Sequence, residues 1–501
     1  MNDSSTLTSH RNRVACVATQ IRSRKQSKIA LSSKGRVGHC VRRNHWKHNC
    51  SLIDVSTLTH VLSTKTATKI CIVEPGITFE HLCQHLLPFG LLPLVIPEFK
   101  NITVGGAVLG LGVESSSFQH GLFEDSIVSM DVLNGKGDII HVTKSCASDL
   151  FYGMFGSYGS MGVLVAVEIQ LMAATSSVQL TYTPTSVKTL ANGECWWPKD
   201  ANPDCDFCEA IVFSKTKASV ITATFTERNA PNTFACYTTD TSHWRFWWGR
   251  WFFQHAEQKQ KVFTEIVPTL DYLFRHDRGI FWCAQVRGVG TSICERVIHG
   301  WYWSSSTAYH TEHKSNTNND FFRIVQDIAI PIKHRRLERF LHFLDSTLNT
   351  YPLWLCPIRN KCHTAPAKIF SLPMVKDNSN ENGEKDDAND ANDANDKVMN
   401  EFYVNVGIYA SPSHWDGRPF HLTYVTAHRA MEDTTRRLRG RKGLYSTSYY
   451  TKEEFNQEYD LKRAEDLREK YHCKCCVDVY TKCCESNIFP TKTTTTTNKE
   501  D

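Results

Sequence analysis

Residues 103–115 constrain this chain more than any other segment, because they place four glycines in one apolar run. The segment reads Thr-Val-Gly-Gly-Ala-Val-Leu-Gly-Leu-Gly-Val-Glu-Ser, and two more serines follow it. Glycine has no Cβ, so the backbone of such a run can approach the phosphates or the ring edge of a ligand. The run therefore predicts a segment of backbone that lies against a cofactor.

The spacing of these glycines excludes two common phosphate-binding motifs. It is neither the Gly-x-x-x-x-Gly-Lys-Ser/Thr of a P-loop nor a Gly-x-Gly-x-x-Gly followed by an acid about 20 residues later. A second glycine-rich loop, 156–162, comes about 45 residues downstream and leads into an apolar stretch. Either loop alone could serve only turns and tight packing. The pair in this order favours two loops that close on opposite sides of one flat, phosphorylated cofactor.

Composition excludes several classes of function. The 501 residues carry a net charge of only +5, which indicates no general nucleic-acid role. The 19 cysteines show no repeating framework, so reduced thiols in a cytosolic setting are expected rather than disulfides. No apolar run reaches the roughly 18 residues of a membrane-spanning helix, so we expect none in this chain.

The first 50 residues leave two interpretations open. They contain eleven Lys or Arg against one acid, Asp3, which is typical of an organelle-targeting segment. The spacing of Val14, Val17 and Ile21 also suits the buried face of an ordinary helix.

The patterning changes near residue 174, which predicts two domains of α+β type. Before it we expect strands at 69–74, 126–133, 138–143 and 162–172 and helices at 79–89 and 148–152, with a hairpin at Asn134–Gly137. After it we expect antiparallel strands within 175–235, a strand and an amphipathic helix within 320–348, and core strands at 351–358 and 402–409. The domains are predicted as 1–174 and 175–435, followed by a segment 436–489 that packs back on the first domain. The acidic insert 374–397 and the tail 490–501 are predicted to be disordered.

Several segments of the first domain resemble one family of FAD-binding proteins. Val73-Glu74-Pro75-Gly76, the 103–115 segment, Gly121-Leu122-Phe123 and 156–171 resemble the FAD domain of the vanillyl-alcohol oxidase and p-cresol methylhydroxylase type. Within that group, Glu98, Gly110-x-Gly112-x-Glu114-x-Ser116-Ser117 and 164–169 resemble the delta-24-sterol reductases. Downstream segments resemble the same family, among them 251–255, 280–282, 325–327, 351–357, 444–445 and 453–455.

The resemblance implies a two-subdomain FAD domain with a mixed α/β cap, and NADPH-dependent reduction of the Δ24 double bond of a sterol. It also implies which residues hold the FAD. These are Gly35, Arg36, Gly38, Thr103, Val104, Gly105, Gly106, Gly110, Gly112, Glu114, Ser115, Gly121, Gly156, Gly159 and Gly162. In this interpretation the backbone amides of the 103–115 segment offset the pyrophosphate charge. Related oxidases tether the flavin through a histidine near the position of His39, whereas these reductases are not known for that bond, so non-covalent FAD is expected.

The residue that supplies the proton is not fixed by any sequence rule. An isolated alkene needs a proton on one carbon as hydride reaches the other. Tyr445 and Tyr449 lie in a family-like segment near the chain end and are the candidates. Glu114 and Glu168 could be structural instead.

Three other clusters have both a functional and a structural interpretation. The aromatic run 243–253 suits either a membrane surface or the core of the cap. The basic run 436–442 could bind a nicotinamide nucleotide's phosphate or an RNA, but a solvated helix end is the simpler account. The cysteines at 473, 475, 476, 483 and 484 lack the spacing of a zinc site, so no metal is expected.

The sequence also departs from the family. The family normally begins with a membrane anchor and a longer N-terminal helix, and we expect both to be absent or trimmed here. This expectation leaves the location open between the endoplasmic-reticulum membrane surface and the cytoplasm. Cys283-Ala284 replaces an expected acid, and the loop at 32–39 is shortened. A flavin oxidase of a small alcohol or sugar acid, or a non-catalytic sterol-binding relative, therefore stays as an alternative.

Overall fold

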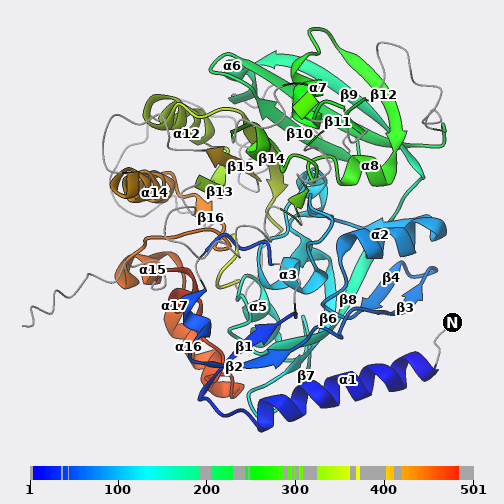
Figure 1. Ribbon diagram of the computed structural model, residues 1–501, viewed down its shortest axis with the longest axis vertical. Coiled ribbons are helices and arrows are strands. Elements are labelled where there is room, and N and C mark those ends of the chain that lie inside the picture. The colour runs from blue at the N-terminus through cyan, green and yellow to red at the C-terminus, as the bar shows by residue number, and fades with distance from the viewer. Residues whose placement is uncertain are drawn as a thin grey trace, which may run out of the picture.

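The chain has an α+β fold, as predicted, with two large sheets and a separate pair of strands (Figure 1). The change from one sheet to the next falls between residues 173 and 177. The computed structural model describes residues 4–34, 38–42, 44–191, 205–229, 243–245, 249–286, 292, 294–295, 298, 304–305, 307, 324–333, 335–361, 368–372, 402–410 and 420–484. The predicted disordered segments 374–397 and 490–501 lie outside the described residues.

The first domain is built on a sheet with strand order β3-β4-β8-β6-β7, and β5 also pairs with β8. The predicted strands and the hairpin are confirmed, and the predicted helices are present as α2 and α5. Helix α2 continues as a short 3₁₀ turn up to Gly90, which ends it in a left-handed conformation with φ 67°. The bounds are β3 Val61–Lys65, β4 Ile70–Val73, α2 Phe79–Leu86, β5 Leu91–Pro93, β6 Ile127–Leu133, β7 Ile139–Thr143, α5 Ser148–Met154 and β8 Val163–Ala173.

The basic N-terminal segment is an ordinary packed helix, α1 (Ser4–Arg22). Val14, Val17 and Ile21 are buried against the parallel pair β1 (Lys28–Ser32) and β2 (Cys50–Asp54). Figure 1 shows α1 lying along one side of the first domain, close to these two strands. The spacing of these three apolar residues therefore predicted the buried face of this helix correctly.

The second domain, the cap, is an antiparallel sheet of eight strands in the order β12-β9-β11-β10-β14-β15-β13-β16. All nine residues of β15 are buried, which explains why its sequence is apolar without alternation. Helices α6, α12 and α14 cover one face of the sheet, and α7 and α8 contribute to the core on the other. The bounds are β9 Ser177–Ser186, α6 Val187–Ala191, β10 Phe207–Val212, β11 Lys217–Thr226, α7 Phe252–Glu257, β12 Phe263–Pro268, α8 Thr269–Leu273, α9 Cys283–Val286, β13 Ile324–Pro331, α12 Arg336–Phe343, β14 Leu353–Arg359, β15 Phe402–Ala410, α14 Phe420–Arg437 and β16 Arg441–Lys442.

The end of the chain returns from the cap to the first domain. After β16 the segment forms α15 (Lys452–Glu458), α16 (Leu461–Lys470) and α17 (Val479–Cys483). The backbone N–H of Ile29 donates to the carbonyl of Cys475 at 2.9 Å, and α16 packs against α5. Figure 1 shows these helices beside β1 and β2. Residues near the C-terminus thus reach the same region as the glycine segment.

Among the helices of the described residues, none is both long and apolar enough to cross a bilayer.

Candidate functional site

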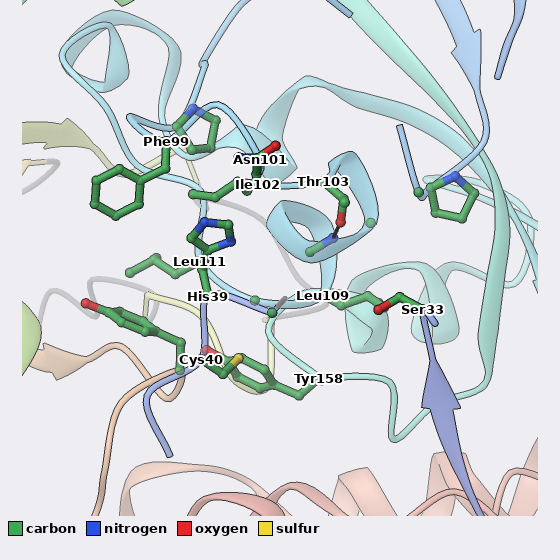
Figure 2. A pocket seen from close by; sticks show the side chains of 18 of the residues that line it. Ser33, His39, Cys40, Phe99, Asn101, Ile102, Thr103, Leu109, Leu111 and Tyr158 are labelled. Carbon is green, nitrogen blue, oxygen red and sulfur yellow. Dashed lines mark hydrogen bonds between the residues drawn. The ribbon is translucent and has the colours of Figure 1, made fainter. Parts of the chain in front are cut away.

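A cavity of about 380 Å³ lies between the glycine segment and the cap (Figure 2). The first domain contributes residues of the 31–42 loop, Pro75-Gly76, the 97–113 segment and Tyr158. The cap side contributes Asp327 of β13 and Tyr409 of β15, and the segment after β16 contributes Tyr445. The cavity therefore has one wall from each domain and one from the returning C-terminal segment.

The glycines of the 103–115 segment let its backbone contact the backbone at Pro75, beside the cavity. The Thr103 hydroxyl accepts from the N–H of Gly106 at 3.1 Å and caps a short helix, α3 (Val104–Leu109). The N–H of Gly105 donates to the carbonyl of Pro75 at 2.7 Å, and a Cβ on Gly105 would lie 2.7 Å from the Cβ of Pro75. Alanine does not fit there. Because these glycines carry no side chains, their backbone itself forms this side of the cavity.

The structure brings together part of the cofactor set that the sequence predicted. Thr103, Gly105, Gly106, Gly110 and Gly38 line the cavity. Val104 is fully buried beneath them. Gly35 and Arg36 lie outside the described residues.

The second glycine loop reaches the cavity through a side chain and not through its glycines. Gly156, Gly159 and Gly162 have φ values of 66°, 74° and 126°, so they serve the backbone turn, and none of them is among the lining residues. Tyr158 lines the cavity instead, and its N–H donates to the carbonyl of Leu109 at 2.7 Å. The two loops therefore meet at Tyr158.

Four other predicted cofactor residues have structural contacts in place of a position on the cavity. Gly112 packs against the Cβ of Phe123, and Gly121 forms a turn with φ 79°. The Glu114 carboxylate pairs with the Arg275 guanidinium at 2.8 Å, and the Ser115 hydroxyl lies 3.0 Å from the hydroxyl of Tyr272. The sequence could not show this, because these two partners are more than 150 positions away.

The buried Arg275 guanidinium joins the first domain to the cap. It also pairs with Glu209 of β10 at 2.7 Å. Burial opposes the ionisation of Glu209, but Arg275 and His276 outweigh it and lower the pKa of that carboxyl. Glu114 and Ser115 therefore hold the end of the glycine segment against the cap.

Arg42 is a cavity residue that the sequence did not single out. Its guanidinium is buried 4.2 Å from the ring centroid of Tyr158 and donates to the carbonyl of Leu444 at 2.8 Å. Within the part of the chain that the structure describes, no carboxylate lies within 4.0 Å of it. Arginine stays charged when it is buried, so this one offers its charge to an anion in the cavity. The first 50 residues contain eleven Lys or Arg, and the sequence gives no reason to select Arg42 among them.

The cap side of the cavity carries a carboxyl group with two donors. Asp327 accepts from the Tyr445 hydroxyl at 2.6 Å and from the Asn405 amide at 2.6 Å. Burial raises the pKa of Asp327, and these two hydrogen bonds oppose that rise. Tyr445 thus lines the cavity, as a candidate proton donor must. Tyr449 is not among the lining residues. Its carbonyl accepts from Arg429, and its ring lies near those of Tyr424 and His428.

The cavity suits a flat, phosphorylated cofactor. Figure 2 shows the His39 ring in the cavity near Ile102 and Leu111, and this ring stacks on Phe99 at 5.8 Å between centroids. Aromatic rings and glycine backbone contribute to the wall, and Arg42 supplies a positive charge. The amides of Gly105 and Gly106 already donate within the protein, so these two amides are not free for the predicted compensation of a cofactor's charge. FAD bound here would contact Thr103, Gly110 and Arg42.

The aromatic run 243–253 is buried where the structure describes it. Trp244, Trp251, Phe252 and Phe253 are at most 4% exposed and belong to the core of the cap. Residues 246–248 lie outside the described residues. The described part favours the core interpretation.

Part of the basic run 436–442 forms ion pairs, while Arg437 and Arg439 are exposed at the end of α14, as a solvated helix end would be. Arg436 and Arg441 pair with Glu458 at 3.2 and 3.3 Å, and the buried Lys442 pairs with Glu432 at 2.6 Å. These pairs fix α14 to α15 and leave less charge for a phosphate.

The cysteines near the C-terminus are buried within the protein. In the described residues, the one group with the geometry of a metal site is Glu114, Glu209 and His276. Arg275 pairs with both carboxylates of that group, so it already supplies the cation.

Comparisons with known proteins agree with this geometry. A family model described as an FAD binding domain matches residues 15–143. The Delta(24)-sterol reductase of Homo sapiens is 27% identical over 490 residues, which cover 95% of this chain and 87% of that protein. The Delta(24)-sterol reductase of Arabidopsis thaliana is 24% identical over 84% of this chain and 74% of its own length. A decaprenylphosphoryl-beta-D-ribose oxidase of Mycolicibacterium smegmatis is 30% identical, but over only 24% of this chain and 26% of its own length. The chain is thus similar to Delta(24)-sterol reductases over most of its length, and it carries an FAD-binding domain.

Proposed function

We propose that this protein is an FAD-dependent reductase that saturates the Δ24 side-chain double bond of a sterol, with NADPH as the electron donor. One observation carries the proposal: the similarity to sterol reductases runs through both domains, including the cap that closes the cavity. An oxidase of small alcohols or sugar acids is the alternative from the FAD domain alone. The oxidase relative matches only about a quarter of the chain, which favours the reductase.

Bound FAD would supply hydride from N5 to one alkene carbon after taking it from the nicotinamide. The residues of this chain hold the reactants and control the proton. Arg42 offsets the cofactor's phosphate charge within the buried wall. Leu109, Leu111 and Val113 give the cavity an apolar side that accepts a hydrocarbon chain and excludes water.

The test separates the three functional hypotheses in one anaerobic experiment. NADPH should bleach the flavin of the purified protein, and a 24(25)-unsaturated sterol should then restore its colour and gain two hydrogens by mass. Bleaching by an alcohol and not by NADPH would support the oxidase. Protein that purifies without flavin and cannot be loaded with it would support a sterol-binding relative.

We also propose that the protein works at the surface of the endoplasmic-reticulum membrane, because its substrate is a membrane lipid. Flotation with vesicles of phosphatidylcholine and unsaturated sterol should carry the protein upward. Equal recovery at the bottom of the gradient with and without vesicles would contradict this proposal.

A further inference from the structure

Glu98 is the one acidic residue of the 97–113 cavity segment that lines the cavity, and the function proposed above does not use it. It lies between Pro97 and Phe99, and its side chain is only partly accessible. Among the described residues, no lysine, arginine or histidine forms an ion pair with its carboxyl group, and no side chain donates a hydrogen bond to it. A carboxyl group with no side-chain partner is rare in a protein interior, because its charged form is poorly solvated there.

Tyr445, the candidate proton donor from the sequence, does not direct its hydroxyl proton into the cavity. The Tyr445 hydroxyl donates its one hydrogen to Asp327 at 2.6 Å, and the Asn405 amide donates to the other oxygen of the same carboxyl group. Each oxygen of the Asp327 carboxyl group therefore accepts a hydrogen bond, and this arrangement suits its ionised form. In this arrangement neither Tyr445 nor Asp327 holds a proton that points to the cavity.

We propose that Glu98 is the proton donor of the reaction, delivering its carboxylic-acid proton to the side-chain carbon of the sterol that does not receive hydride. This inference rests on the proposed function. The alkene gains a hydride at one carbon, with both electrons coming from the reduced cofactor, and a proton at the other. Glu98 is left as a carboxylate and regains a proton from water once product leaves, so the protein is unchanged after a turnover.

The charges around Glu98 agree with an acid that keeps its proton. Burial raises its pKa well above the usual value, and the neighbouring carboxyl groups of Asp327 and Glu114 raise it further. The carboxyl's own backbone N–H and Arg275 oppose the rise, but Arg275 is already paired with Glu114 and Glu209. These charged groups come from the glycine segment, the segment after α8 and strand β13, which are the elements that face Glu98.

The experiment measures the two half-reactions of the FAD-loaded protein separately. In Glu98→Gln the rate of flavin bleaching by NADPH and the flavin content should match the wild type, because no proton donor is needed there. Reoxidation by a 24(25)-unsaturated sterol should slow by about 100-fold or more, which is typical for the loss of a general acid. Glu80→Gln is the matched control, since Glu80 lies nearby on α2 and forms only a long contact with Lys100 at 3.7 Å.

A pH series distinguishes proton donation from a structural effect. In the wild type the sterol-dependent rate should fall as pH rises through the raised pKa of Glu98, and in Glu98→Gln that step should disappear. Folding is checked by the unfolding midpoint, which should not fall in Glu98→Gln because an unpaired acid is replaced by its neutral isostere.

Two results would overturn the inference. One is a Glu98→Gln protein that reoxidises with sterol at the wild-type rate while Tyr445→Phe does not. The other is an unchanged pH step in Glu98→Gln. Failure of the wild type itself to reduce the sterol would instead count against the proposed function, so the two failures are distinguishable.

Discussion

Replacing Arg275 with methionine should destabilise the protein by about 3–5 kcal/mol, the usual effect of removing one partner of a buried ion pair. Arg275 is 3% exposed, and its guanidinium donates to Glu209 at 2.7 Å, to Glu114 at 2.8 Å and to the carbonyl of Tyr272 at 3.0 Å. Methionine fills much of the same space but leaves two buried carboxyl groups without a cation. Since whole domains are stable by only about 5–15 kcal/mol, this is a large fraction of the total.

The loss should depend on pH in a defined direction. In the wild type the pKa of Glu209 is lowered, so its stabilising contribution is present above its unfolded value and fades as pH falls. In Arg275→Met the two carboxyl groups lose their main cation. His276 and Trp354 still donate to Glu209 but do not replace that charge, so the pKa values of both carboxyl groups rise and stability falls as pH increases. The difference between the two proteins should therefore grow from about pH 5 to about pH 8.

Urea unfolding followed by tryptophan fluorescence at both pH values measures this difference. The control is Arg335→Met, because Arg335 pairs with Glu338 at 2.5 Å on the surface and is 76% exposed, so its loss should change stability little at either pH. A destabilisation of Arg275→Met below about 1 kcal/mol, or one that is equal at both pH values, would refute the assigned role of this ion-pair cluster.

Two further predictions concern the cofactor cavity. Gly105→Ala should lose most of its bound FAD, because the new Cβ would lie 2.7 Å from the Cβ of Pro75. Flavin absorbance per purified protein measures this against the wild type, and equal contents would show that the close approach is unimportant. Arg42→Met should weaken FAD binding by about 10- to 100-fold, the value of a charged hydrogen bond of roughly 1.5–3 kcal/mol. Quenching of flavin fluorescence during titration of the apoprotein measures this, and an unchanged dissociation constant would exclude Arg42 as an anion partner.

The local structure of this chain could be predicted well because local sequence determines it. Asn134–Gly137 specifies a hairpin by its turn chemistry, and Val14, Val17 and Ile21 specify a helix face by their spacing. The apolar run in β15 indicated a core strand, since it is buried on both sides. The glycine segment indicated a close approach of its backbone to a cofactor, which stays a prediction, and the close approach in the structure is that of Gly105 to Pro75. It could not indicate that two of its amides bond to Pro75 and Thr103, because the first of these contacts joins positions about 30 residues apart.

The sequence alone determined the type of fold, the similarity to sterol reductases and the segment that forms one wall of the cavity. Only the tertiary structure decided which side chains share the cavity. Arg42, Glu98, Asp327 and Tyr445 come from segments up to about 400 residues apart and are adjacent only because the chain end folds back over the first domain. The same folding assigned Glu114 and Ser115 to the junction with the cap, through partners on the segment after β12. Spacing reports the neighbours of a residue along a helix or strand, whereas the charges that it meets in the interior depend on how the domains pack.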